Sequence, residues 1–386
     1  MGSSDSRAPG RLRRLLGSLV RLLLALIVAL LLLEGAARLL DLGVPPRGSV
    51  AMASMYVPAP ETVMPGLGKR LRPGARGTAV YRGLGGDPDR TVVYEVNALG
   101  FRGRAFAEEK PPGVYRIAMV GDSVTFGTGV DEEQTMARVL ERELSARLPA
   151  RRFEVLNAGV PASNTGQHVA LLRFRVQWFD PDLVFFTSTL TDTTGYGIPN
   201  EEDRAAEISW EERLVRDLGL TSGRWRDGEY LGDRTPAIDR AMWLRKHSVL
   251  ADFLANRLYG WLRGRLELAS YHSTWTEGSP GLAKLEASLA EARSLADEHG
   301  FELHVGMFPF LTQLDENYPF QRQTETLRGI CDSLGIPFVD LLEPLRGREA
   351  APLKAHVHDR HPGPEAHELV GRFLADYLMP SVEAGG

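Results

Sequence analysis

From residue 115 onward, the chain alternates short apolar runs with segments of helical periodicity. Five runs have the composition of buried strands and lie at residues 115–121, 153–159, 182–190, 301–307 and 336–341. Amphipathic helical patterns stand between them, as at residues 134–148 and 281–300. Strands that alternate with helices predict an α/β domain with a mostly parallel sheet covered on both faces. Catalytic groups are then expected at the carboxyl ends of the strands.

The composition narrows the class of protein further. Apolar residues make up 43% of the 386 residues and charged residues 25%, which excludes a disordered or collagen-like chain. Cys331 is the single cysteine, so it can form neither an intramolecular disulfide nor a Cys-rich metal site. The net charge of −5 divides into +4 over residues 1–21, from five arginines and Asp5, and −9 over the rest. This balance argues against a general nucleic-acid binder.

An apolar run over residues 15–33 follows the basic N-terminus. At 1.5 Å per residue it spans about 28 Å, close to the roughly 30 Å hydrocarbon core of a bilayer. Arg21 is its one charge, and Glu34 and Arg38 follow without a clear small-residue cleavage site. We therefore expect an uncleaved single-span anchor with the N-terminus in the cytoplasm and the remainder exported. A cleaved signal peptide and a buried helix of a soluble protein are the alternatives.

Three regions are expected along the chain. Residues 1–40 form a basic stub and transmembrane anchor, Pro- and Gly-rich residues 41–89 form a spacer, and residues 90–386 form the main domain. An insertion at about residues 200–280 exceeds what a five-stranded fold needs. It holds five of the six tryptophans, at positions 210, 225, 243, 261 and 275. These rings either pack the insertion onto the core or form a cap that stacks on substrate.

Two polar motifs lie where strands end and have complementary chemistry. The first, GDSVTFG, occupies residues 121–127 and places Ser123 directly after the first strand. A serine hydroxyl is a poor nucleophile unless a base removes its proton. The second, DRHPGPEAH, occupies residues 359–367 and can supply His361 as that base, with Asp359 to orient the ring.

In the order of its motifs, the chain from about residue 90 to 380 resembles the GDSL, or SGNH, hydrolase family. The motifs are GDS after the first strand, NAGVP after the second, TD after the third and DRHP near the C-terminus. NALGFRG and NTGQ are similar to a membrane-anchored bacterial branch of that family. The resemblance implies a flavodoxin-like three-layer α/β/α sandwich with strand order 2-1-3-4-5. It also implies ester hydrolysis with Ser123 as nucleophile, His361 as general base and acid, and Asp359 as its orienting partner.

The resemblance also implies an oxyanion hole, and here the sequence departs from the family pattern. The hole would use the backbone N–H of Ser123, that of Ala162 where relatives have glycine, and the side chain of Thr191 where they have asparagine. Alanine keeps the N–H if it can adopt the required backbone angles. Threonine reaches less far than asparagine, so the hole is expected to be weakened. Candidate substrate-binding or supporting residues are Asp122, Gly159, Asn164 and Asp192.

Simpler explanations exist for several of these residues. Ser123 could be a helix cap, Asp192 could brace the turn after the third strand, and Asn164 with Gln167 could cap the next helix. The histidines at positions 356, 358, 361 and 367 are close in sequence, but no acidic or cysteine partner stands at a recognised zinc spacing. We therefore expect no metal site and no cofactor.

The sequence predicts a membrane-anchored SGNH-type serine esterase that acts outside the cytoplasm, as a single-pass protein of a bacterial inner membrane with a periplasmic catalytic domain. Its expected partners are a small-molecule or polysaccharide ester and the membrane. Two alternatives stay open. One is an O-acyltransferase that delivers the acyl group to an envelope polysaccharide, and the other is a catalytically silent module that binds a carbohydrate or ester.

Overall fold

The structure is a computed structural model of the chain. It describes residues 8–40, 50–51, 55–81, 89–193, 225–226, 229–230, 271–356 and 359–384, together with short pieces between 240 and 258. The chain divides into two compact units, one formed by Met1–Pro46 with Ala205–Glu267 and the other by Arg47–Arg204 with Leu268–Gly386.

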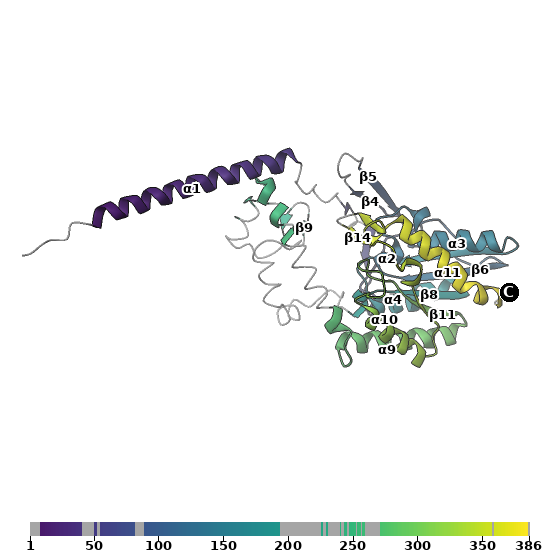
Figure 1. Ribbon diagram of the computed structural model, residues 1–386. Coiled ribbons are helices and arrows are strands. Elements are labelled where there is room, and N and C mark those ends of the chain that lie inside the picture. Colours follow the sequence, from purple (N-terminus) through teal and green to yellow (C-terminus); the bar gives the residue numbers. More distant parts are fainter. Residues whose placement is uncertain are drawn as a thin grey trace, which may run out of the picture. The chain divides into compact units, whose positions relative to one another are not determined.

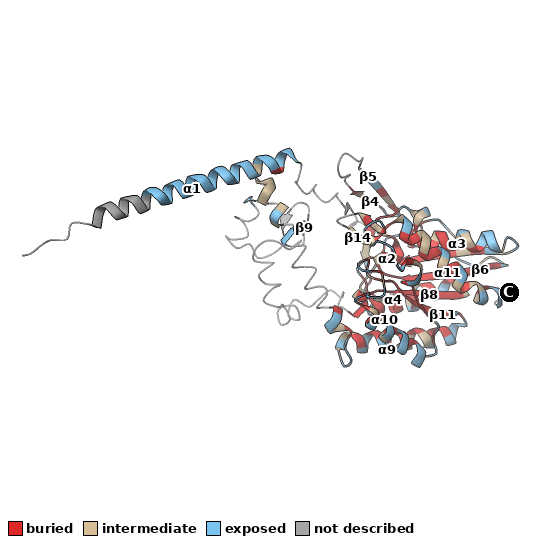
Figure 2. Ribbon diagram, viewed as in Figure 1, coloured by how far each residue is buried: buried red, intermediate tan, exposed pale blue. Residues whose placement is uncertain are grey.

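The first unit contains a long helix, α1 (Ala8–Leu39), drawn in purple in Figure 1. Its segment Gly17–Leu39 has a mean hydropathy of 2.5 and is long and apolar enough to cross a membrane. The described side chains of this segment are mostly exposed, as the pale blue ribbon in Figure 2 shows. Near its end, the Glu34 carboxylate accepts hydrogen bonds from the backbone N–H groups of Val249 and Leu250, and thereby caps a short helical piece.

The second unit is built on a five-stranded parallel sheet. Its strand order is β12 (Phe338–Asp340), β11 (Glu302–Met307), β8 (Leu183–Ser188), β6 (Val114–Gly121) and β7 (Arg152–Gly159). Counted along the chain, this is the order 2-1-3-4-5 that the sequence predicts. All eight residues of β6 are buried, because helices cover both faces. The predicted fold class is confirmed.

Helices form the two outer layers of this sheet. The helices α3 (Met136–Arg147) and α11 (Pro364–Ala384) lie on one face and pack against each other. On the other face lie α4 (Thr165–Phe174), α9 (Pro280–His299) and α10 (Gln321–Ser333), as Figure 1 shows. Each helix turns an apolar stripe to the sheet, as α3 does with Met136, Val139, Leu140 and Leu144. This division follows from right-handed crossovers on either side of β6.

The spacer expected over residues 41–89 is a point on which the structure differs from the sequence interpretation. Described residues in this range form a hairpin of β2 (Tyr56–Pro58) and β3 (Lys69–Leu71). They also supply β1 (Val50–Ala51) and β4 (Arg76–Tyr81) to an antiparallel sheet whose third strand is β5 (Arg90–Glu95). Met55, Leu67 and Ala79 are buried in the same core as the five-stranded sheet. Pro65, Gly66, Pro73 and Gly74 lie in turns next to strands with packed apolar residues, so the described residues 55–81 belong to the folded unit.

Much of the predicted insertion, including Trp210 and Trp261, lies outside the described residues. Of its described parts, β9 (Trp225–Arg226) and β10 (Glu229–Tyr230) pair as a short antiparallel ribbon. Trp243 is 62% exposed, whereas Trp275 is buried and donates its indole N–H to the carbonyl of Leu190 at 2.9 Å. For Trp275, packing onto the core is therefore the role that the structure supports.

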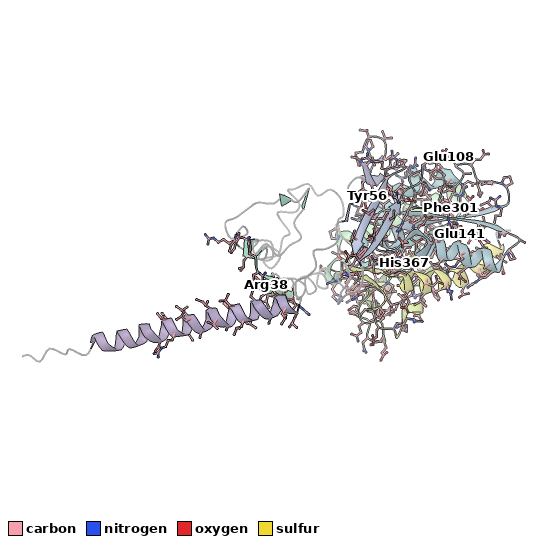
Figure 3. All side chains as sticks on the ribbon, turned by 90° about the horizontal axis from the view of Figure 1, so that it is seen from above. Arg38, Tyr56, Glu108, Glu141, Phe301 and His367 are labelled. Carbon is pink, nitrogen blue, oxygen red and sulfur yellow. The ribbon has the colours of Figure 1, made fainter. Side chains whose placement is uncertain are left out.

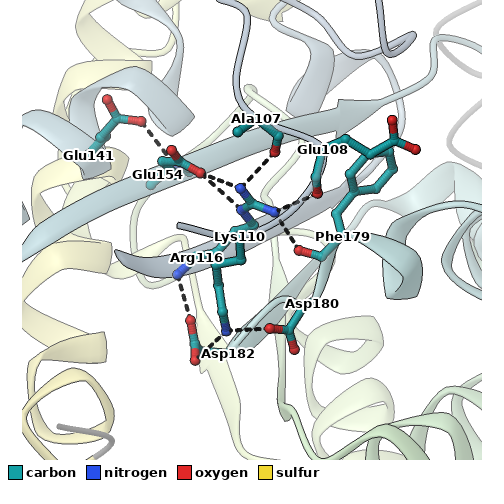
Figure 4. A network of polar contacts seen from close by, with 10 residues as sticks. Ala107, Glu108, Lys110, Arg116, Glu141, Glu154, Phe179, Asp180 and Asp182 are labelled. Atoms are coloured by element: carbon teal, nitrogen blue, oxygen red, sulfur yellow. Dashed lines mark hydrogen bonds and ion pairs between the residues drawn. The ribbon is translucent and has the colours of Figure 1, made fainter. Parts of the chain in front are cut away.

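A buried arginine ties the amino ends of the strands to the segment that precedes β6 (Figure 4). Arg116 in β6 is fully buried, and its guanidinium donates two hydrogen bonds to Glu154 in β7 at 3.0 and 2.7 Å. Its remaining bonds go to the carbonyl oxygens of Phe179, Ala107 and Glu108. A charge taken out of water is tolerated only when it is paired and hydrogen-bonded in this way.

Replacement of Arg116 by methionine should lower the free energy of unfolding by about 3–5 kcal/mol, because Glu154 and three carbonyls lose their donor. The matched control is Arg293→Met, which removes an exposed pair with Asp297 in α9 and should cost less than about 1 kcal/mol. Urea denaturation of the two variants in detergent measures both values. Equal, small losses would show that the Arg116 network contributes little to stability.

Candidate active site

The candidate nucleophile lies on a tight turn at the carboxyl end of β6. Asp122 caps the short helix α2 (Ser123–Phe126) by accepting the N–H of Val124 at 2.8 Å, and Gly127 ends it in the left-handed conformation. Ser123 is therefore the first residue of a helix that starts at the edge of the sheet. A Cβ on Gly121 would lie 2.1 Å from the Thr125 side chain and 2.9 Å from the carbonyl oxygen of Thr187, so there is no room for a side chain at this position.

The three residues predicted to act together are in direct contact. His361 Nε2 lies 2.9 Å from Ser123 Oγ, and His361 Nδ1 lies 2.5 Å from Asp359 Oδ1. Asp359 and His361 belong to β14 (Asp359–Pro362), which pairs with β13 (Lys354–His356) just before α11. Folding thus joins a serine and a histidine that are 238 positions apart in the sequence.

The charges of this group favour one arrangement of protons. Burial alone would raise the pKa of Asp359, but its bonds and charge attraction to His361 outweigh burial and lower that pKa to about 2. Burial alone would lower the pKa of His361, but Asp359 outweighs burial there too, and the pKa of His361 is raised. An ionised carboxylate only accepts, so Nδ1 carries the proton in the neutral ring and Nε2 presents its lone pair to Ser123.

Ala162 has an unusual backbone conformation for a residue other than glycine. Its φ is +54°, in the left-handed region where glycine is favoured. At the start of the loop that contains Ala162, the N–H of Val160 donates to the carbonyl of Gly121 at 2.9 Å. This bond places the loop beside the turn that carries Ser123. Ser163 anchors the loop from inside through hydrogen bonds to Val160 and His168. Alanine holds this left-handed conformation at a cost of about 1–2 kcal/mol.

Thr191 lies in the turn η4 (Leu190–Thr193) that follows β8. Its hydroxyl is 2.8 Å from the hydroxyl of Thr189 and 3.5 Å from Asp122 Oδ2. Thr189 also donates to Asp122 Oδ2 at 3.1 Å. The side chain of Thr191 therefore lies at the nucleophile turn, but these contacts connect it to the residue behind Ser123.

Two buried carboxyl groups support this corner of the site. Asp192 accepts hydrogen bonds from the Ser188 hydroxyl at 2.7 Å and the Thr189 N–H at 3.1 Å, and so braces the turn after β8. Burial raises the pKa of Asp122, and burial together with the charge of Asp122 raises the pKa of Asp192 to about 7. The charge of Asp122 thus disfavours the ionised form of Asp192.

Asn164 and Gly159 have structural positions. Asn164 caps α4 in a reciprocal capping box with Gln167, as the simpler interpretation of the sequence predicts. A Cβ on Gly159 would lie 2.1 Å from the backbone N of Phe126, so this glycine lets α2 approach β7 closely.

Of the clustered histidines, only His361 contacts the candidate nucleophile among the described contacts. His367 (labelled in Figure 3) is fully buried in α11, where its Nδ1 accepts the N–H of Met136 and burial lowers its pKa to about 3. The ring of His356 lies beside that of Tyr81, and His358 lies outside the described residues. Within the described part of the chain, no three His, Cys, Asp or Glu side chains form a group that could hold a metal ion.

Two further residues contact the candidate site, and the sequence analysis predicted neither of them. The Tyr81 hydroxyl donates to Asp359 Oδ2 at 3.0 Å. The guanidinium of Arg102 donates to three carbonyl oxygens at the end of α2, the helix that begins with Ser123, and in the loop after it. These are the carbonyl oxygens of Phe126, Gly127 and Val130. Arg102 belongs to the NALGFRG motif, which was visible in the sequence without an assigned role, whereas Tyr81 fell within the predicted spacer.

The sequence model of the GDSL-like lipase/acylhydrolase family matches residues 119–369. The chain belongs to this family. It is accordingly an ester-bond hydrolase by family. A comparison with curated proteins finds no match.

Similar folds occur among solved structures of GDSL-like and related hydrolases. The α/β hydrolase LAE5 from the metagenome of Lake Arreo shares 16% identity and a TM-score of 0.39, over 68% of this chain and 94% of that one. Axe2, an acetylxylan esterase from Geobacillus stearothermophilus, shares 15% identity and a TM-score of 0.38, over 69% and 93%. Likeness at this level gives no information about substrate.

The left-handed conformation of Ala162 gives a prediction about stability. Ala162→Gly should raise the free energy of unfolding by up to about 1 kcal/mol, because relief of strain exceeds the added freedom of the unfolded chain. Ala287→Gly, at an exposed position inside α9, should lower it by about 1 kcal/mol. Thermal denaturation of both variants tests the opposite signs. A loss in both would mean that alanine is not strained at position 162.

Proposed function

We propose that the protein is a membrane-anchored serine esterase that acts outside the cytoplasm through a covalent acyl-enzyme. The observation that carries this proposal is the continuous chain of contacts from Ser123 Oγ to His361 Nε2 at 2.9 Å and from His361 Nδ1 to Asp359 at 2.5 Å. A helix cap would explain Ser123 alone but not its contact with a histidine that is itself paired with a carboxylate.

In the first half of the reaction, Ser123 Oγ attacks the acyl carbon while His361 Nε2 takes the hydroxyl proton. The resulting imidazolium faces Asp359, whose lowered pKa keeps it ionised throughout. The negative charge on the former carbonyl oxygen is bound by the backbone N–H groups of Ser123 and Ala162. The intermediate then collapses, the C–O bond to the alcohol breaks, and His361 returns the proton to the leaving oxygen.

In the second half, water attacks the acyl carbon and His361 Nε2 accepts its proton. Collapse of this intermediate breaks the bond to Ser123 Oγ, returns the proton to the serine and releases the acid. Thr191 contributes less to the oxyanion hole than an asparagine would, because its hydroxyl is engaged with Thr189 and Asp122. The loss of one oxyanion donor typically slows acyl transfer by about 10²–10³.

The proposed location follows from the first residues of the chain. A basic N-terminus before the apolar segment Gly17–Leu39 favours retention of the N-terminus in the cytoplasm and export of the rest. In the proposed domain arrangement, residues 1–40 anchor an exported hydrolase domain that begins before residue 90. In a bacterium, that domain would face the periplasm.

Ser123→Ala should reduce hydrolysis of short-chain p-nitrophenyl esters by a factor of about 10⁴ or more and abolish labelling by a fluorophosphonate. Ser333→Ala removes an exposed hydroxyl in α10 that bonds only locally to Ile330, and it should keep both activities. The measurement is steady-state hydrolysis by the full chain in detergent, with mass spectrometry of the labelled peptide. Activity that survives in Ser123→Ala would reject the proposed nucleophile.

The raised pKa of His361 predicts how the rate depends on pH. His361 must be neutral to accept the serine proton, so kcat/KM should rise with pH along a limb centred above about 6.5, the ordinary value for histidine. Asp359→Asn removes the charge that raises this pKa, so the limb should move to lower pH while the maximal rate falls by about 10⁴. A profile of kcat/KM against pH for both proteins checks the two effects. An unmoved limb in the variant would contradict the assignment of Asp359.

A further inference from the structure

Tyr81 contacts the proposed relay, which consists of Ser123, His361 and Asp359. It lies in a part of the chain that the family match does not include. The match covers residues 119–369, whereas Tyr81 is the last residue of β4 and lies 278 positions before Asp359. Its hydroxyl donates to Asp359 Oδ2 at 3.0 Å. The other carboxylate oxygen, Oδ1, accepts from Nδ1 of His361 and from the backbone N–H of the same residue at 3.0 Å. Tyrosine and histidine thus bond to opposite oxygens of one carboxylate.

The tyrosine ring is held firmly in place. Tyr81 is 9% exposed, and its strand partner Arg90 places a guanidinium 5.1 Å from the ring centroid. Arg90 also donates to the carbonyl of Ala355 at 2.7 Å, in the strand that pairs with the one carrying Asp359 and His361. On the nucleophile side, a Cβ on Gly129 would lie 3.1 Å from the Tyr81 hydroxyl oxygen, so the loop after α2 passes close to it.

This arrangement fixes the rotation of the Asp359 carboxylate. A carboxylate with one bonded oxygen can turn about its Cβ–Cγ bond, and the imidazole that depends on it turns with it. A donor on Oδ2 removes that freedom, so that Oδ1 stays in line with Nδ1 and Nε2 stays aimed at Ser123. The bond also stabilises the ionised carboxylate, in agreement with the lowered pKa of Asp359.

We propose that Tyr81 is a positioning residue of the esterase, which holds the Asp359 carboxylate in the orientation that aligns His361 with Ser123. The inference deepens the proposed function and rests on it. Tyr81 touches neither substrate nor the reacting atoms, and it keeps its proton throughout. Burial and the neighbouring charge of Asp359 both raise the pKa of its hydroxyl, so the group remains a donor across the working range of pH.

The first test is Tyr81→Phe, which keeps the ring packing and removes only the hydroxyl. We expect kcat to fall between about 10-fold and 100-fold with KM unchanged, because misalignment of the base affects the reaction and not substrate binding. The matched control is Tyr115→Phe, another buried tyrosine, near the amino end of β6, which should keep the wild-type kcat. A wild-type kcat in Tyr81→Phe would overturn the proposal.

A structural readout separates positioning from a general loss of stability. In the wild type, the proton on His361 Nδ1 should give a low-field ¹H resonance that is protected from exchange by its short bond to Asp359. Tyr81→Phe should shift this resonance and speed its exchange with water, whereas Tyr115→Phe should leave it in place. An unchanged resonance in Tyr81→Phe would also overturn the proposal, whatever its kcat.

A double-mutant cycle decides whether Tyr81 acts through Asp359. In the Asp359→Asn background, Tyr81→Phe should lower kcat by less than twofold further, because the carboxylate that it orients is gone. If the two effects multiply in full, Tyr81 acts by another route and the proposal fails. Failure of the proposed function itself looks different, since wild-type protein would then show neither ester hydrolysis nor fluorophosphonate labelling of Ser123.

Discussion

The close approach of the nucleophile helix to two neighbouring strands is the constraint on which the site depends. Gly121 at the end of β6 and Gly159 at the end of β7 are opposite each other in the parallel register. A side chain at either position would collide with α2, at 2.1 Å in both cases. Because the two glycines let α2 pack closely against β6 and β7, Ser123 lies at the edge of the sheet. Its Oγ is 2.9 Å from Nε2 of His361, a residue 238 positions further along the chain.

The other end of that short helix is held by a buried charge. Arg102 is 4% exposed, and burial lowers its pKa to about 10, so it still carries its proton at neutral pH. Its charge is compensated by the carbonyl oxygens of Phe126 and Gly127 at the C-terminal end of α2, by that of Val130 in the following loop, and by the faces of the Tyr94 and Phe126 rings. Asn157 in β7 adds a bond to the carbonyl of Thr125 at 2.9 Å. A four-residue helix has little stability of its own, so these contacts with the rest of the unit stabilise α2.

Sequence patterns could predict those parts of the structure that leave a local signal, such as the periodicity of a strand or a short motif. The parallel sheet follows from apolar runs of strand length, and Ser123, Asp359 and His361 follow from two motifs at strand ends. Tyr81 and Arg102 leave no such signal, because each acts through contacts with residues that are distant in the sequence. The glycines and prolines around Tyr81 indicated a spacer, although the apolar residues between them alternate as in a half-buried strand. Thr191 lies after the third strand, β8, as the sequence predicts. Its contact with Asp122 could not be predicted, because Asp122 follows β6 and the sequence pattern does not show that β6 and β8 are neighbours.

Residues before position 90 are therefore packed into the same core as the five-stranded sheet, as Met55, Leu67 and Ala79 show. A hydrolase domain cut at residue 90, as the composition suggests, would lose β4 and with it the donor to Asp359. It would also remove the strand that pairs with β5, which carries the fully buried Val92 and Tyr94. The residues matched by the family model contain the candidate nucleophile and base, but Tyr81 and Arg102, which contact this site, lie before them. Orientation of the proposed relay thus depends on residues of the second unit that lie outside the two sequence motifs.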